Sequence, residues 1–177
     1  MENKLKHFYE TIGEDFFTYP NLYAQVVASS PNNAHFVEVG CWKGRSASFM
    51  GVEIHNSGKK IKLDCIDHWD TEDGFELFKE NTKTLSHIIT PICSDSVKGA
   101  NLYEDGSLDF VFIDAGHLTH EVLADMNAWY PKVKSGGIFA GHDYFPGSWD
   151  SVVVAVNEWM GDKKFVVSEG CWIYGKP

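Results

Sequence analysis

Residues 36–46 read FVEVGCWKGRS, in which a short apolar run leads into a glycine loop and then into a segment of helical character. Gly40 allows the unusual backbone angles of a tight turn, and Gly44 allows the backbone to approach a ligand closely. A helix that begins here presents unpaired N–H groups and the positive end of its dipole to that ligand. This strand–loop–helix order predicts one unit of an α/β fold, with a binding site at the loop.

The same alternation of short apolar runs and longer amphipathic segments continues to the C-terminus. Strands are predicted over 35–39, 61–66, 88–93, 108–113, 137–140, 165–167 and 171–174. Helices are predicted over 45–56, 73–85, 95–102, 119–133 and 149–160. The first five runs are apolar almost throughout, which is typical of parallel strands that are covered on both faces.

The last two apolar runs are separated only by Ser168, Glu169 and Gly170. So short a link permits a hairpin but not a parallel crossover. We therefore expect an α/β, doubly wound, mostly parallel seven-stranded sheet with an antiparallel C-terminal hairpin. An N-terminal helical extension over 1–32, made of two helices, precedes one domain over 33–177.

The length and charge of the chain narrow the range of partners. A chain of 177 residues suits one domain, and a net charge of −10 disfavours binding to nucleic-acid phosphates. No apolar run approaches the roughly 20 residues that a membrane span requires. The four cysteines form no C-x-x-C pair, so free thiols in a reducing, cytoplasmic setting are expected. We expect a small-molecule substrate, with no nucleic acid and no membrane as partner, and a homo-oligomer stays open.

The residues around the glycine loop indicate which cofactor it suits. Their spacing is G-x-x-x-G rather than the G-x-G-x-x-G of dinucleotide-binding proteins, and no G-K-[ST] of a P-loop follows. Glu38 would repel a pyrophosphate but can accept from a cationic amino group. Ser46 can cap the helix or hold a ligand carboxylate. An amino-acid-bearing cofactor fits this loop, and the alternative is an ordinary glycine-rich turn.

Polar residues also follow the second and third predicted strands. In doubly wound sheets, a carboxylate after the second strand binds ribose hydroxyls, which makes Asp67 a candidate together with His68. Asp95 and Ser96 follow the third strand, where they could bind an adenine amino group. The alternatives are a solvated carboxylate at Asp67 and a helix N-cap at Asp95.

The strongest local feature is the run FIDAGH at 112–117, in which Asp114 and His117 follow a buried strand. The next strand ends with His142 and Asp143. If these strands are neighbours, Asp114, His142 and Asp143 meet, and such ligands suit a divalent cation. His117 could act there as a general base, and His120 is a weaker candidate. Alternatively, backbone groups beneath the loop hold His142.

The segment from Phe110 to Tyr144 resembles class I S-adenosylmethionine-dependent methyltransferases. It looks like their small-domain type 24 group, which is similar to catechol and macrocin O-methyltransferases. The resemblance extends from about residue 33 to the C-terminus. It implies a Rossmann-like methyltransferase fold with a reversed strand inserted near the end of the sheet, and it makes 33–177 the S-adenosylmethionine-binding domain.

The resemblance also implies roles for individual residues. The cofactor contacts correspond to Glu38, Gly40 and Gly44 in the loop, Asp67 at the ribose, and Asp95 and Ser96 near the adenine. Asp114, also counted among the cofactor contacts, corresponds to the first metal-binding aspartate of the O-methyltransferases. His117 stands where these proteins carry a Lys or His base. His142 and Asp143 stand at an Asp-Asn or acidic pair, so His142 departs from the catechol pattern.

The predicted function is transfer of a methyl group from S-adenosylmethionine to a hydroxyl of a sugar, a polyol or a phenol. Asp114 and His117 are the predicted catalytic residues. Asp114, His142 and Asp143 are the predicted ligands of a divalent metal such as Mg²⁺. Two alternatives stay open. A metal-dependent hydrolase or hydroxylase would use the same side chains without this cofactor, and a non-catalytic module would bind the cofactor without turnover.

Overall fold

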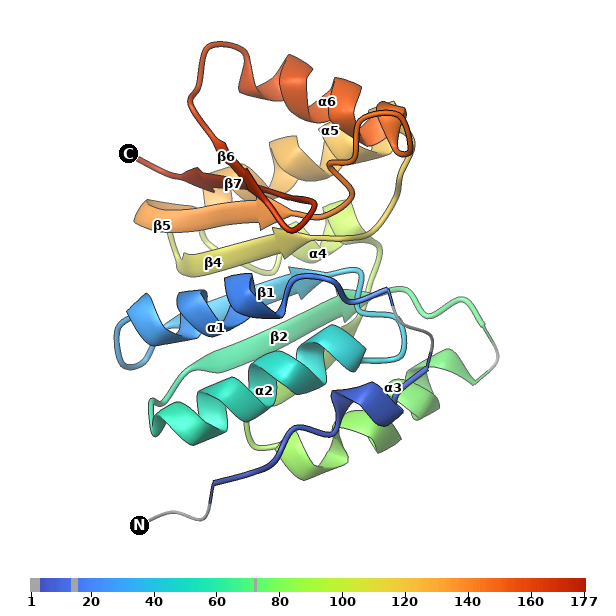
Figure 1. Cartoon of the computed structure of the whole chain (residues 1–177), viewed down its shortest axis with the longest axis vertical. Coiled ribbons are helices and arrows are strands. Elements are labelled where there is room, and N and C mark those ends of the chain that lie inside the picture. The colour runs from blue at the N-terminus through green and yellow to red at the C-terminus, as the bar shows by residue number, and fades with distance from the viewer. Residues whose placement is uncertain (1–3, 14–15, 72) are drawn as a thin grey trace.

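The computed structural model describes residues 4–13, 16–71 and 73–177, which form a seven-stranded sheet flanked by helices (Figure 1). The strands are β1 (His35–Val39), β2 (Lys62–Asp67), β3 (Ile89–Cys93), β4 (Leu108–Ile113), β5 (Val133–Gly141), β6 (Val166–Ser168) and β7 (Cys171–Gly175). Their order across the sheet is β3-β2-β1-β4-β5-β7-β6. Strands β1 to β5 pair in parallel, and β7 runs antiparallel between β5 and β6. The predicted mostly parallel sheet, its C-terminal hairpin and the inserted reversed strand are confirmed.

Helices cover both faces of this sheet. They are α1 (Pro20–Ser29), α2 (Arg45–Ser57), α3 (Gly74–Thr82), α4 (Ser96–Ala100), α5 (Thr119–Trp129) and α6 (Asp150–Met160). Helices α1, α2 and α3 pack on one face, and α4, α5 and α6 pack on the other (Figure 1). Neighbouring strand residues alternate between the two cores, with Phe36 and Phe110 in one and Val37 and Val111 in the other. This double burial explains why the strands are apolar at nearly every position.

The N-terminal prediction is wrong in one respect. The first of its two helices is a single 3-10 turn, Tyr9–Thr11, and the second is α1. Helix α1 begins at Pro20, whose missing N–H costs nothing at a helix start. Residues 16–19 lie outside any helix and lead directly into α1.

Two later boundaries also differ from the prediction. The helix expected over 119–133 ends at Trp129, and a 3-10 turn that contains Pro131 follows, because proline cannot donate the next helical hydrogen bond. The strand expected over 137–140 already begins at Val133. A register shift between Leu108 and Phe110 keeps β5 paired with β4 across this longer stretch.

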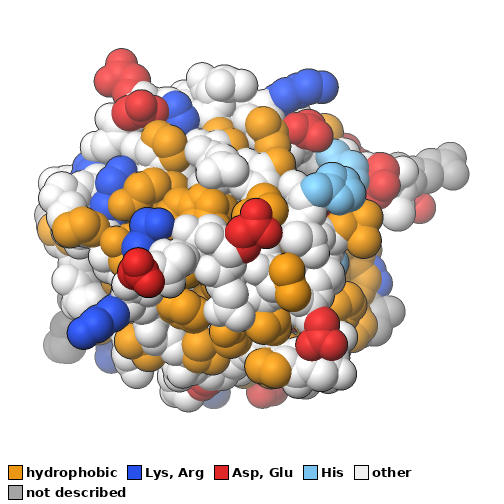
Figure 2. All heavy atoms as spheres, turned by 90° about the horizontal axis from the view of Figure 1, so that it is seen from above, with side chains coloured by type: hydrophobic (Ala, Val, Ile, Leu, Met, Phe, Trp, Pro, Cys, Tyr) orange, Lys and Arg blue, Asp and Glu red, His pale blue; other side chains and the backbone are white. Residues whose placement is uncertain are grey.

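One end of the sheet is an exposed edge. Strand β6 is the last strand, and its Val166 and Val167 are largely exposed, as is Val154 of α6. Figure 2 looks onto the end of the molecule where α6 and β6 lie in Figure 1, and apolar side chains are visible there between charged ones. Within the described part of the chain, no helix is long and apolar enough to cross a membrane. The homo-oligomer stays a prediction.

Backbone hydrogen bonds hold the carboxyl ends of β1, β2 and β4 together. The Gly40 N–H donates to the Ile66 carbonyl at 2.8 Å, and the Asp114 N–H donates to the Val39 carbonyl at 2.7 Å. Gly40 has a φ of +85°, and a Cβ at this position would collide with the Asp114 carbonyl. Glycine is therefore required at this turn. Its small size lets the loops that follow β1, β2 and β4 leave the sheet side by side.

We expect Gly40→Ala to lower the free energy of unfolding by more than the ~1–2 kcal/mol that a left-handed backbone costs alanine. The added methyl group would also collide with the Asp114 backbone. Urea titration followed by circular dichroism measures the loss. Gly58→Ala is the matched control, because Gly58 also has a positive φ, +69°, but nothing within 4 Å of a new Cβ. Equal losses in the two variants would contradict the collision.

Candidate functional site

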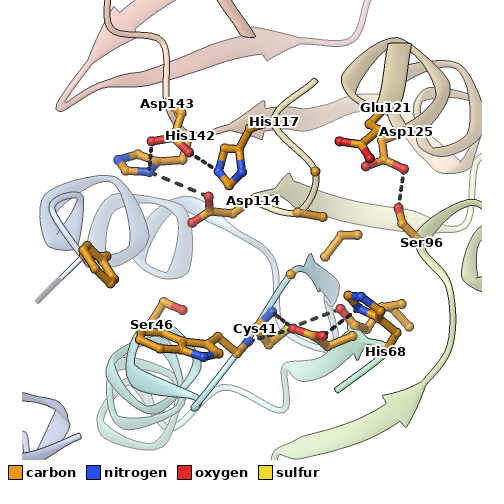
Figure 3. A pocket seen from close by; sticks show the side chains of 18 of the residues that line it. Cys41, Ser46, His68, Ser96, Asp114, His117, Glu121, Asp125, His142 and Asp143 are labelled. Atoms are coloured by element: carbon orange, nitrogen blue, oxygen red, sulfur yellow. Dashed lines mark hydrogen bonds and ion pairs between the residues drawn. The ribbon is translucent and has the colours of Figure 1, made fainter. Parts of the chain in front are cut away.

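A cavity of about 1000 Å³ opens at the carboxyl ends of the central strands (Figure 3). Eleven of the residues selected from the sequence line it, namely Gly40, Ser46, Asp67, His68, Asp95, Ser96, Asp114, His117, His120, His142 and Asp143. Glu38 and Gly44, which were also selected, are not among its lining residues. The fold thus gathers the predicted metal and base residues, and all the predicted cofactor residues except Glu38 and Gly44, around one space.

Gly44 has a structural role that differs from the predicted approach to a ligand. It is the N-cap of α2, with a φ of +83°, so Ser46 is not the cap. A Cβ on Gly44 would crowd Thr82 and Phe78. Glycine therefore allows α2 to begin close to α3. The first residues of α2, Arg45 and Ser46, still line the cavity.

Glu38 lies behind the cavity wall and contacts it through Ser46. Ser46 Oγ donates a hydrogen bond to Glu38 Oε1, while the buried Oε2 has no partner among the described residues. Burial raises the pKa of Glu38 to about 8, and the bond from Ser46 partly opposes this rise. When Ser46 donates its hydroxyl proton to Glu38, its oxygen can still accept a hydrogen bond from a ligand, which suits an ammonium group. The ligand carboxylate that the sequence also offered for Ser46 stays a prediction.

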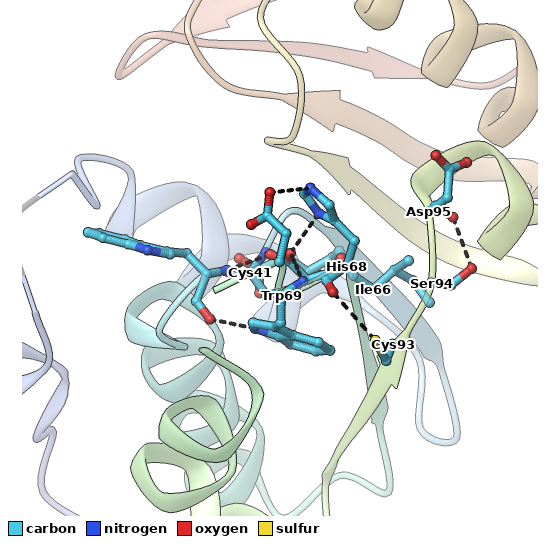
Figure 4. Close-up of polar contacts among 11 residues, drawn as sticks. Cys41, Ile66, His68, Trp69, Cys93, Ser94 and Asp95 are labelled. Atoms are coloured by element: carbon cyan, nitrogen blue, oxygen red, sulfur yellow. Dashed lines mark hydrogen bonds and ion pairs between the residues drawn. The ribbon is translucent and has the colours of Figure 1, made fainter. Parts of the chain in front are cut away.

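Asp67 fastens the glycine loop to the end of β2. Its Oδ2 accepts from the backbone N–H groups of Cys41 and Trp42, each at 2.8 Å. Its Oδ1 accepts from the N–H of Trp69 at 3.0 Å, and His68 Nδ1 lies 3.2 Å away (Figure 4). The carboxylate therefore orders two loops that border the cavity. Its contact with a ribose stays a prediction.

The predicted adenine side is organised around α4. Asp95 is the N-cap of this helix and accepts from the Lys98 N–H at 3.2 Å, as the alternative interpretation expected. Ser96 Oγ donates to Asp125 Oδ1 at 2.5 Å and accepts from Trp129 Nε1 at 3.2 Å. Burial raises the pKa of Asp125 to about 6. Asp125 also lines the cavity and was not predicted, although an acid beside the apolar stripe of α5 was a usable signal.

Asp114, His142 and Asp143 converge because β4 and β5 are neighbours. His142 Nδ1 lies 3.2 Å from Asp143 Oδ1 and 3.7 Å from Asp114 Oδ1 (Figure 3). One potential ligand atom of each residue lies within 4.8 Å of the other two. The condition on which the predicted metal site depended is therefore met. The ring of His142 contacts side chains rather than the backbone groups of the alternative interpretation.

The charges in this cluster balance one another. Burial lowers the pKa of His142, but its bonds to Asp114 and Asp143 outweigh burial and raise that pKa to about 9. Burial raises the pKa of Asp143, but the bonds from His117 and His142 outweigh it and hold the pKa well below its usual range. An imidazolium thus faces two carboxylates. A cation that bound His142 Nδ1 would displace its proton.

His117 lies beside the cavity with Asp143 behind it. Its Nε2 is 2.7 Å from Asp143 Oδ2, and an ionised carboxylate can only accept, so Nε2 carries a proton. This hydrogen bond raises the pKa of His117. The ring is stacked on Trp149, with centroids 4.7 Å apart. Nδ1 remains as the proton acceptor, which is the arrangement of a base oriented by a carboxylate.

Residues before α1 complete the site, although none was selected from the sequence. Thr18 Oγ1 lies 2.9 Å from His142 Nε2, across 124 positions of sequence. The Tyr19 hydroxyl donates to Asp114 Oδ2 at 2.8 Å, across 95 positions. Both residues line the cavity. No local pattern signals contacts between segments so far apart.

Comparison with known proteins gives one family and one curated relative. Residues 37–144 match a family model described as a methyltransferase domain. An uncharacterized protein of Acanthamoeba polyphaga mimivirus is 29% identical over 136 residues, which is 72% of this chain and 59% of that protein. The chain therefore spans less than two thirds of the length of this relative.

Solved structures share the fold at low sequence identity. The O-methyltransferase NovP is 16% identical, with a TM-score of 0.70 over 90% of this chain and 80% of NovP. The MycE methyltransferase of the mycinamycin biosynthetic pathway was solved with Mg and SAH (S-adenosylhomocysteine). It is 14% identical, with a TM-score of 0.64 over 93% of this chain and 51% of MycE.

The raised pKa of Glu38 predicts a stability that depends on pH. The folded state keeps this proton up to about pH 8, whereas an unfolded glutamate loses it near 4.5. The free energy of unfolding should therefore fall as the pH rises between these values, by up to ~1.4 kcal/mol per pH unit from this group. Because Glu38→Gln removes this loss, we expect the variant to gain stability relative to the wild type as the pH rises.

Urea titrations at pH 4.5 and pH 8 measure this difference, because the two values bracket the titration of Glu38. Glu76→Gln is the control, since Glu76 is an exposed residue of α3. If the difference in the free energy of unfolding between Glu38→Gln and the wild type is the same at both pH values, Glu38 does not have a raised pKa in the folded state.

Proposed function

The chain belongs to the methyltransferase-domain family, and on that premise we propose that it methylates a hydroxyl oxygen of a small acceptor, a sugar, a polyol or a phenol. One observation carries the proposal. A single cavity has a glycine loop and a helix start on one side and the Asp114, His117, His142 and Asp143 cluster on the other. Family membership favours this hypothesis over a metal-dependent hydrolase or hydroxylase and over a non-catalytic module.

The cofactor is S-adenosylmethionine, and its groups find matching partners along the cavity. Ser46 at the start of α2 offers an acceptor for the ammonium group, with Glu38 behind it. Asp67 and His68, which line the cavity after β2, are the proposed partners of the ribose hydroxyls. Asp125, with Ser96 on one oxygen, offers its other carboxyl oxygen to the adenine amino group.

A divalent cation fits the donor set of Asp114, His142 and Asp143. Two carboxylates and an imidazole within 4.8 Å suit Mg²⁺ and, because of the imidazole, also Mn²⁺ or Zn²⁺. MycE, which has the same fold, was solved with Mg. S-adenosylmethionine would supply an electrophilic methyl group, and the cation would favour the deprotonated acceptor hydroxyl.

His117 is the proposed base. Its Nδ1 takes the proton of the acceptor hydroxyl while Asp143 holds Nε2 and stabilises the imidazolium that forms. With S-adenosylmethionine bound, the deprotonated oxygen would form the new bond to the methyl carbon, and the bond from that carbon to sulfur would break to leave S-adenosylhomocysteine. The protein contributes the alignment of the acceptor oxygen, the methyl carbon and the sulfur.

The first test is the titration of the protein with S-adenosylhomocysteine by calorimetry, with and without Mg²⁺. We expect Asp67→Ala to weaken binding by about tenfold or more. The glycine loop and the loop after β2 together lose three charge-assisted hydrogen bonds that order the edge of the cavity. Asp105→Ala is the control, since Asp105 is exposed and forms an ion pair with Lys132 at the surface. Unchanged binding in Asp67→Ala would remove this residue from the cofactor site. No binding by the wild type would contradict the proposed function.

We expect His117→Ala to slow methyl transfer by about 10²- to 10⁴-fold while the affinity for S-adenosylhomocysteine stays unchanged, because a base acts only on the acceptor. Single-turnover assays on hydroxylated acceptors measure the rate. His87→Ala, an exposed histidine outside the cavity, is the control. A variant that lost cofactor affinity but kept its rate would identify His117 as a binding residue.

A further inference from the structure

Figure 3 shows His142 facing Asp114 and Asp143, with His117 beside Asp143. In each of the three proposed metal ligands, one atom, the inward atom, faces the cluster, and another, the outward atom, contacts a side chain outside it. The inward atoms are Asp114 Oδ1, His142 Nδ1 and Asp143 Oδ1. The outward atoms are bonded to three other side chains, with Asp114 Oδ2 to Tyr19 at 2.8 Å, His142 Nε2 to Thr18 at 2.9 Å, and Asp143 Oδ2 to His117 at 2.7 Å. Such outer partners fix the orientation of metal ligands in proteins.

Two of the three outer partners are consecutive residues of the N-terminal segment. Tyr19 is only 1% exposed, and its ring lies 4.7 Å from the rings of both Phe112 and His142. The segment is also fastened to the turn between β6 and β7. Asn21 Nδ2 donates to Glu169 Oε1 at 2.5 Å, and the Leu22 N–H donates to Oε2 at 3.3 Å. Thr18 and Tyr19 therefore have fixed positions above the cluster.

We propose that Thr18 and Tyr19 are positioning residues of the metal centre, which hold His142 and Asp114 in the orientation that a cation requires. The inference rests on the metal site of the proposed function. It extends that site to a segment that lies before the family match, which begins at residue 37. The N-terminal segment is then a working part of the centre.

The chemistry of the two hydroxyl groups suits this role. If His142 Nδ1 binds a cation, the ring carries its proton on Nε2. The Nε2–H group then donates a hydrogen bond to Thr18 Oγ1. Tyr19 donates a hydrogen bond to Oδ2 of Asp114, which favours the orientation of the carboxylate in which Oδ1 is directed at the centre. Both bonds order the ligands before the ion arrives, which lowers the entropy cost of binding. Within the described part of the chain, the hydrogen bonds of these two hydroxyl groups do not involve the glycine loop.

The test measures metal binding and cofactor binding separately. Metal-free protein is titrated with Mn²⁺, with free Mn²⁺ followed by electron paramagnetic resonance, and with S-adenosylhomocysteine in the absence of metal. We expect Thr18→Val and Tyr19→Phe each to weaken Mn²⁺ binding by about 10- to 100-fold. Affinity for S-adenosylhomocysteine should stay at the wild-type value. Thr18→Ser keeps the hydroxyl and should bind Mn²⁺ as the wild type does.

Thr11→Val and Tyr9→Phe are matched controls in the same segment. The Thr11 hydroxyl donates to the nearby Phe8 carbonyl at 2.7 Å, and the Tyr9 ring packs on Phe17 and Phe49. These variants should bind Mn²⁺ normally. Circular dichroism checks the fold of every variant. If Tyr19→Phe does not fold, the positioning role is tested by comparing the Mn²⁺ affinities of Thr18→Val and Thr18→Ser.

The outcomes separate this inference from the proposed function. Wild-type Mn²⁺ affinity in Thr18→Val and Tyr19→Phe would overturn the positioning role. A wild-type protein that binds S-adenosylhomocysteine but no Mn²⁺ would overturn the inference and leave methyl transfer standing. A wild-type protein that does not bind S-adenosylhomocysteine would overturn the proposed function itself.

Discussion

The close approach of the Gly40 and Asp114 backbones is the constraint on which the site depends. Parallel strands β1 and β4 are neighbours, so their carboxyl ends lie at the same edge of the sheet. The turn after β1 can pass the end of β4 only because Gly40 has no Cβ. The glycine loop and the acidic cluster therefore share one cavity. A bulkier residue would separate the two halves of the site.

Charge balance is the second constraint at this edge. Two carboxylates side by side repel each other and lose solvation when they are partly buried. His142 lies between Asp114 and Asp143, and His117 and Tyr19 take the outward oxygens. Each carboxylate is therefore compensated from two directions. The same arrangement turns one potential ligand atom of each residue toward the other two.

The sequence predicted the fold well and the site in part. Runs of apolar residues identify the parallel strands, because both faces of the sheet are buried. Asp114 and His142 could be selected because each follows such a strand. The packing of Gly44 against α3 and the bond from Ser46 to Glu38 of β1 were not predicted, since both depend on neighbours that are distant in sequence. Helix and strand ends were displaced where Pro131 or a register shift intervenes.

By itself, the sequence determined the order of strands and helices, the reversed last strand, and which residues stand at the carboxyl ends of the strands. These properties follow from local hydrophobicity, short links and glycine positions. Only the tertiary structure decided that Thr18 and Tyr19 hold His142 and Asp114, and that Glu38 lies behind Ser46. The physical reason is that a hydrogen bond between distant segments depends on how elements pack in space, and packing is not encoded in any local pattern.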